Sequence, residues 1–138
     1  MRWGGEEGEP QMNADERRLN ELTERIIGCA YDVANGLGAG FLEKVYENAL
    51  RIDLQRRGLA VLQQQPIPVM WRGEVVADYV ADLLVEGQVI VELKAVKALD
   101  EVHFAQCLNY LRATGLRVCL LINFGKSQID VKRIVHNF

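Results

Sequence analysis

The 138-residue sequence lacks any apolar run that approaches the length of a membrane-spanning helix. Residues 1–18 carry several charges and no apolar segment, so they do not have the pattern of a secretory signal. We therefore expect a cytoplasmic protein with no membrane partner.

Cysteine is scarce, and the three cysteines, Cys29, Cys107 and Cys119, form no Cys-x-x-Cys pair. An odd number without paired spacing argues against a disulfide framework and against a structural zinc site. Three thiols are also too few for an iron–sulfur cluster held by the cysteines of one chain. Buried, reduced thiols are the simplest interpretation.

Basic side chains are not in excess, because 16 Lys and Arg stand against 19 Asp and Glu, a net charge of −3. A basic surface is usual in nucleic-acid-binding proteins, so this balance argues mildly against tight binding. Three basic and five acidic side chains lie in residues 1–19, which leaves a net charge of only −1 beyond them. If some of those remaining acids face a metal ion, the rest of the surface is slightly positive.

The start of the chain differs in composition from the rest. Residues 1–14 are rich in Gly and Glu, and we expect a disordered leader over residues 1–18. The sequence as a whole is 49% hydrophobic and 25% charged, an ordinary globular composition. Residues 19–138 are therefore expected to form a single domain.

Hydrophobic periodicity predicts a mixed α/β chain in the order helix, helix, three strands, helix, two strands. Apolar residues spaced three and four apart predict helices at about 19–36, 42–58 and 100–115. Short Val-rich runs at 61–62, 67–71, 75–85 and 89–96, separated by turn residues, predict the meander of three strands, and runs at 116–123 and 129–135 predict the last two strands.

The strand expected at 89–96 carries charge where charge is costly. Its apolar residues lie on both sides of the pleat, as in a strand covered on both faces. Glu92 and Lys94 are two residues apart and therefore project from the same face. Buried charges need partners. These two either pair with each other, lie at the sheet edge, or bind a ligand, and the alternatives are evenly balanced.

The turn after the preceding strand determines where Asp82 points. A two-residue loop at 86–87 places Asp82 and Glu92 on opposite faces. A three-residue loop at 85–87, with Gly87 in the left-handed position, pairs Asp82 with Ile90 and puts Asp82 diagonal to Glu92 on one face. We adopt that register, in which the two carboxylates lie roughly 7–8 Å apart, a span that a bridging cation can accommodate.

Two carboxylates and an ammonium on one face form a hydrolytic set. Asp82 and Glu92 would bind Mg²⁺ or Mn²⁺ through oxygen, and the metal would activate a bound water. Lys94 would orient that water or take its proton. Asp82…Glu92-x-Lys94 alone is a weak pattern, since it occurs by chance in many chains.

Further motifs accompany this pattern in the sequence. Gly40-x-x-Glu43-x-x-Tyr46 precedes it, and Gln106-x-x-x-Tyr110 and the stretch 121–125 (LINFG) follow it. With these motifs, residues 19–138 resemble the GxxExxY protein family, which is placed in the PD-(D/E)XK nuclease superfamily. The resemblance implies a restriction-endonuclease-like αβββαβ core, a central mixed sheet flanked by helices, and metal-dependent phosphodiester hydrolysis.

The motif residues then acquire expected roles. Glu43 would join Asp82 and Glu92 as a metal ligand, and Gln106 would hold Lys94 or a metal-bound water. Tyr110 would contact phosphate.

Other residues carry two interpretations each. Tyr46 is expected in the core, with its hydroxyl at the rim of the substrate site. His103 would bind substrate or metal, although a plain histidine in the first helical turn is favoured. Glu47 is well spaced to pair with Arg51.

Two aromatic residues are candidate platforms for base stacking. For Trp71 and Phe124, core packing is favoured over stacking on bases.

Three functional hypotheses follow. The first is a metal-dependent nuclease acting on DNA in preference to RNA, with homodimerisation left open because so small a domain offers few surfaces to clamp a duplex. The second keeps the fold as a catalytically silent module that binds nucleic acid or protein, and the net acidity favours it. The third is a hydrolase of a small phosphodiester.

Overall fold

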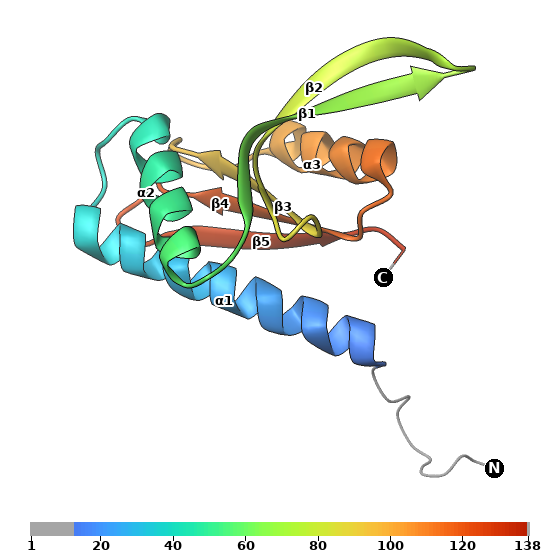
Figure 1. Cartoon of the computed structure of the whole chain (residues 1–138). Helices are drawn as coiled ribbons and strands as arrows, with labels where there is room; N and C mark the ends of the chain where they lie inside the picture. Colours follow the sequence, from blue (N-terminus) through green and yellow to red (C-terminus); the bar gives the residue numbers. More distant parts are fainter. Residues whose placement is uncertain (1–12, 138) are drawn as a thin grey trace, which may run out of the picture.

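Figure 1 shows the computed structural model of the chain, which describes residues 13–137. The elements follow the expected order and build a five-stranded mixed sheet flanked by three helices. They are α1 (Ala14–Leu37), α2 (Glu43–Arg56), β1 (Val61–Trp71), β2 (Glu74–Val85), β3 (Val89–Lys94), α3 (Glu101–Thr114), β4 (Val118–Asn123) and β5 (Asp130–Val135). None of the helices within residues 13–137 has the length and apolarity needed to cross a bilayer.

The first helix begins earlier than expected. Asn13 caps α1, because its side chain accepts a hydrogen bond from the Glu16 N–H at 2.8 Å and its own N–H donates to Oε1 of Glu16 at 3.1 Å. Helix α1 therefore starts at Ala14 rather than at Leu19. The part of the expected leader that covers residues 1–12 lies outside the described residues.

The sheet has the order β1-β2-β3-β4-β5, with β3 and β4 parallel at its centre and every other pair antiparallel. All six residues of β4 and five of the six in β3 are buried, as continuous apolar runs predict for strands covered on both faces. Strand β5 lies at one edge of the sheet.

Helices cover both faces of the sheet, and each face has its own core. Helices α1 and α2 pack on one face around residues such as Ile26, Leu50 and Leu93. Helix α3 packs on the other face with Leu111, over Leu121 and its neighbours. The three cysteines are buried and unbridged, as expected.

Strands β1 and β2 form a long arm. They pair with each other from Val61–Val85 to Trp71–Glu74, with an interruption at Gln64, and β1 runs as one strand through both short apolar runs at 61–62 and 67–71. Only Leu83–Val85 of β2 pairs with β3, and the remainder projects from the sheet beside α3 (Figure 1). Trp71, near the tip, is 63% exposed, so the expectation of core packing is wrong for Trp71. It is correct for Phe124, which is buried and stacks on Tyr46.

The turn between β2 and β3 differs from the expected one. Both Glu86 and Gly87 have positive φ, 55° and 65°, and the Gln88 N–H donates to the Val85 carbonyl at 3.0 Å. Leu84, not Asp82, lies opposite Ile90, so the adopted register was wrong by two residues. A shift of two preserves the alternation of side chains, and Asp82 therefore still faces the same side as expected.

Candidate active site

Asp82 and Glu92 lie where β2 leaves the sheet. The backbone ladder between β2 and β3 ends at the Leu83–Val91 pair. Beyond it the Leu93 N–H donates to Oδ2 of Asp82 at 2.8 Å, and the Asp82 N–H donates to Oε1 of Glu92 at 3.2 Å. Each carboxylate thus occupies a position that a strand carbonyl would otherwise take, and the two acids are brought together as the sequence predicted.

An irregularity in β1 lies beside this break. The pairs Gln63–Leu83 and Gln65–Ala81 flank Gln64, which has φ = 55°, a left-handed conformation that is rare outside glycine. Residues two apart in a strand normally face the same side. Here Leu83 belongs to the core under α1 and α2, whereas Ala81 belongs to the core under α3. The faces of the arm are therefore reversed at the level of Asp82.

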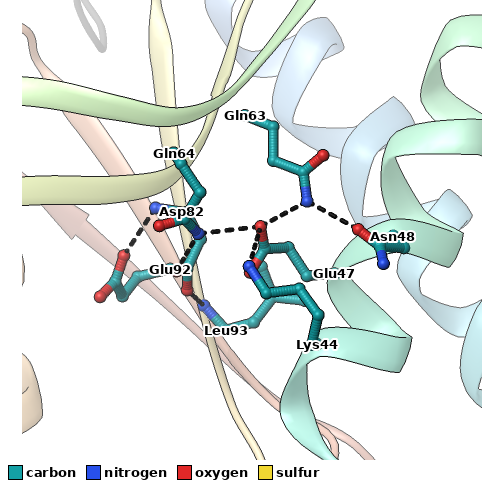
Figure 2. Close-up of polar contacts among 8 residues, drawn as sticks. All are labelled: Lys44, Glu47, Asn48, Gln63, Gln64, Asp82, Glu92 and Leu93. Atoms are coloured by element: carbon teal, nitrogen blue, oxygen red, sulfur yellow. Dashed lines mark hydrogen bonds and ion pairs between the residues drawn. The ribbon is translucent and has the colours of Figure 1, made fainter.

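Glu47 is a member of the site that the sequence analysis missed. It lies on α2, is only 1% exposed, and accepts hydrogen bonds from Gln63 at 2.6 Å and from Gln64 at 2.9 Å (Figure 2). The Lys44 ammonium lies 3.1 Å from both of its carboxylate oxygens. The expected Glu47–Arg51 pair was wrong, because the Arg51 side chain donates to Gln55 instead. The four-residue spacing of Glu43 and Glu47 was the available signal.

Glu43 lies beside the site without a direct contact to Asp82 or Glu92. Burial raises the pKa of Glu43, and the nearby charge of Asp82 raises it further, while Lys94 opposes both effects. Glu43 is therefore electrostatically part of the cluster.

Lys94 ends β3 and is half-buried. Within residues 13–137 it makes no direct ion pair, yet its charge lowers the pKa of Asp82, Glu92 and Glu43 against the larger effect of burial. The segment after it is fastened by Asn123, which is fully buried and bonds both the N–H and the carbonyl of Val96, at 3.0 and 2.9 Å. The ammonium thus stands on a fixed strand end beside the acids.

The acids outnumber the cations in this cluster. Burial raises the pKa of Asp82, and burial together with the charge of Asp82 raises the pKa of Glu92 to about 7. Both shifts have the sign expected when carboxylates are withdrawn from water close to one another. The cluster contains four carboxyl groups but only two ammonium groups, those of Lys44 and Lys94. The carboxyl groups are those of Glu43, Glu47, Asp82 and Glu92, so the ionised cluster has an excess of negative charge.

The donor set fits a hard divalent cation with few protein ligands. Across residues 13–137, no three acidic, histidine or cysteine side chains are arranged as a ready-made set of metal ligands. Asp82, Glu92 and Glu43 therefore do not converge as the expected trio. Mg²⁺, however, is commonly bound through one or two carboxylates and retains several waters. Asp82 and Glu92, in a cluster with surplus negative charge, meet that requirement.

The two expected tyrosines are both buried, at 1% exposure each. The Tyr110 hydroxyl contacts Glu92 rather than a surface where phosphate could lie. The Tyr46 hydroxyl donates to the Gly38 carbonyl at 2.6 Å and accepts from the Phe41 N–H at 3.2 Å. Its hydroxyl is therefore not at a rim, and it fastens the loop between α1 and α2.

Two residues of α3, Gln106 and His103, take no part in the hydrogen bonds around Asp82 and Glu92. Gln106 is half-buried, one turn before Tyr110, and its side chain makes no hydrogen bond within residues 13–137. His103 accepts a hydrogen bond from the Asp100 N–H at 3.1 Å, which makes it a capping residue of the first turn of α3. This is the plainer of its two interpretations.

An αβββαβ core with an aspartate on one strand and Glu-x-Lys on the next is the arrangement expected of a nuclease fold. The chain belongs to the PD-(D/E)XK nuclease superfamily, whose family model matches residues 20–134. Its fold is similar to that of an alkaline exonuclease (LHK-Exo) from Laribacter hongkongensis, with a TM-score of 0.52 and 16% sequence identity over 91% of this chain and 73% of that chain. A search of curated protein sequences finds no match.

Proposed function

We propose that the protein is a metal-dependent phosphodiester hydrolase that cleaves nucleic acid, with DNA favoured over RNA. The observation that carries the proposal is that Asp82 and Glu92 lie side by side, where the Asp82 N–H donates to Glu92 and the Leu93 N–H donates to Asp82, with the Lys94 charge beside them. Membership of a nuclease superfamily and the likeness to an exonuclease fold support it.

In this proposal Asp82 and Glu92 bind Mg²⁺ or Mn²⁺, with Glu43 close enough to adjust the charge of the site. A bound divalent ion supplies an acidified water and neutralises charge on the phosphate. The Lys94 ammonium donates hydrogen bonds to the attacking water or to a phosphate oxygen, and the rigid end of β3 keeps it in place. Gln106, on the helix over this part of the sheet, assists from the substrate side.

The test is a cleavage assay on the purified chain. Single-stranded, duplex and branched DNA, and matched RNA, are incubated with Mg²⁺ or Mn²⁺. Asp82→Asn and Lys94→Ala should each lose at least about 100-fold in rate, the scale expected when a group that stabilises the transition state is removed. Circular dichroism and thermal melting show whether the variants remain folded.

Matched control variants lie on the same sheet. Asp78→Asn changes an exposed aspartate of β2, and Lys132→Ala changes an exposed lysine of β5 at the opposite edge. Both should retain the parental rate. Cleavage that persists in Asp82→Asn and Lys94→Ala would instead indicate a contaminating nuclease.

The same assay separates the other two functions. Binding of nucleic acid without cleavage under any condition would favour a silent module of the same fold, which suits the net charge of −3. Turnover of bis(p-nitrophenyl) phosphate without turnover of any polymer would favour a small phosphodiester as substrate. Homodimerisation is also open for so small a domain. Sedimentation with and without duplex DNA measures whether the active form is a homodimer.

A further inference from the structure

Gln64 links two carboxylates that come from different elements. Its Nε2 lies 2.9 Å from Oε2 of Glu47 on α2 and 3.3 Å from Oδ1 of Asp82 on β2 (Figure 2). A primary amide nitrogen carries two hydrogens, so both contacts are made at once. Ionised carboxylates only accept hydrogen bonds, and this chemistry requires the nitrogen rather than the oxygen of the amide to face them.

The backbone at Gln64, which makes this link, has a strained conformation. Its φ of 55° is left-handed, although the residue is not glycine and lies inside a strand. Backbone conformations of this kind persist only where the surrounding structure determines them, and they gather at functional sites. A regular strand would keep Gln64 in the ladder opposite Asp82, where instead the pairing is interrupted.

The link passes from a fixed group to a candidate metal ligand. Glu47 is fully buried and is held by Lys44 and by the Gln63 amide as well as by Gln64. Asp82 has fewer constraints, since the Leu93 N–H holds Oδ2 while Gln64 is the side chain that donates to Oδ1. Removing the amide would leave Oδ1 near another carboxylate with no donor between them.

We infer that Gln64 is a positioning residue, which orients Asp82 for metal binding by tying it to Glu47. This inference rests on the proposed function, in which Asp82 binds the metal. Groups that hydrogen-bond a metal-ligating carboxylate fix its orientation, and their loss typically costs about 10–100-fold in metal affinity or activity.

Two substitutions of Gln64 separate the role of its amide from that of its backbone conformation. Gln64→Gly and Gln64→Ala both remove the amide, but only alanine places a Cβ at positive φ. Both variants should lose about 10–100-fold in kcat and bind Mn²⁺ about 10-fold more weakly by electron paramagnetic resonance titration, with KM for nucleic acid unchanged within twofold. Thermal melting should separate them: Tm should fall in Gln64→Ala and be retained or raised in Gln64→Gly.

Gln65→Ala is the matched control. Gln65 is the same residue type on the same strand, and the one hydrogen bond that its amide makes within residues 13–137 goes to the carbonyl of Pro66, at 3.4 Å. It should leave kcat, Mn²⁺ affinity and KM at the parental values.

Two results would overturn the inference. One is parental kcat and Mn²⁺ affinity in Gln64→Gly, whether or not Gln64→Ala shows a loss that follows its lower Tm; the other is an equal loss of kcat and Mn²⁺ affinity in the control Gln65→Ala. Should the parent cleave nothing yet bind Mn²⁺, the proposed function fails while the Mn²⁺ titrations still decide the role of Gln64. If the parent binds no Mn²⁺, there is no metal site to position and the inference falls as well.

Discussion

The Tyr110 hydroxyl lies 3.2 Å from Oε2 of Glu92 and 3.1 Å from the carbonyl oxygen of Val80, beneath α3. Burial and the adjacent charge of Glu92 raise the pKa of Tyr110, so the hydroxyl remains protonated and able to donate. Glu92 therefore has a neighbour at each oxygen, with the Asp82 N–H at Oε1. We therefore expect Tyr110 to act on the proposed site by holding Glu92, since its side chain is only 1% exposed.

Tyr110→Phe should consequently impair the site without weakening substrate binding. Loss of one buried hydrogen bond to a charged group should cost about 1.5–3 kcal/mol in the free energy of unfolding. We expect kcat to fall about 10-fold, because Glu92 is no longer oriented, and KM to remain within twofold. Urea denaturation and steady-state kinetics measure the two effects.

Tyr31→Phe provides the control, since Tyr31 is 42% exposed on α1 and should tolerate loss of its hydroxyl. A Tyr110→Phe variant with raised KM and unchanged kcat would contradict this role and restore the expectation of a direct phosphate contact.

Glu92 should make the stability of the metal-free protein depend on pH. Its pKa is raised from 4.5 to about 7 in the fold, so the folded state binds the proton more tightly than the unfolded state. The corresponding stabilisation is complete below pH 4.5 and is lost as the pH rises through about 7. In EDTA, Tm should therefore fall between pH 5 and pH 8, by roughly 2–8 °C.

Mg²⁺ should reverse this loss, because a cation favours the ionised carboxylates that burial disfavours. The rise in Tm on adding Mg²⁺ should be larger at pH 8 than at pH 5. Glu92→Gln should have a shallower dependence of Tm on pH in EDTA. An unchanged slope in that variant would assign the effect to another group.

The sequence predicted the element order and the main acids, because both depend on local residue chemistry. Continuous apolar runs predicted β3 and β4, and charges within such a run drew attention to Glu92 and Lys94. The placement of Asp82 was correct although the register was not, since an error of two residues preserves the face.

The contributions of Gln64 and Glu47 could not be predicted, because they depend on long-range geometry. Nothing in a run of glutamines indicates which one adopts positive φ, and Glu47 had a nearer partner on its own helix. Trp71 was misplaced for a related reason. Strand periodicity does not reveal that β2 leaves β3 at Asp82, and core packing requires a neighbouring layer.

Tyr46 offers a test between a structural and a substrate-binding role. Its hydroxyl bonds the Gly38 carbonyl and the Phe41 N–H, so Tyr46→Phe should loosen the loop before α2 and cost about 1 kcal/mol in unfolding free energy. KM for nucleic acid should stay within twofold, because the hydroxyl is enclosed. A KM raised by fivefold or more at unchanged stability would return Tyr46 to the substrate site.

Gly125 should be the least replaceable glycine near the site. A Cβ there would overlap the backbone N and O of Val96 and would lie 2.7 Å from the carbonyl carbon of Ala95. These are main-chain atoms of the segment after Lys94, and Asn123 pins that segment, so they cannot move aside cheaply. Gly125→Ala should therefore destabilise the fold by about 1–3 kcal/mol and lower kcat by displacing Lys94.

Gly36→Ala is the matched control, because Gly36 lies in α1 with open space around its Cβ position, and the change should be neutral or stabilising by about 0.5–1 kcal/mol. Urea denaturation measures the free energy of unfolding of both variants. If Gly125→Ala is as stable as Gly36→Ala, the loop after β4 can shift to accept the Cβ, and the close contact with Val96 does not hold Lys94 in place.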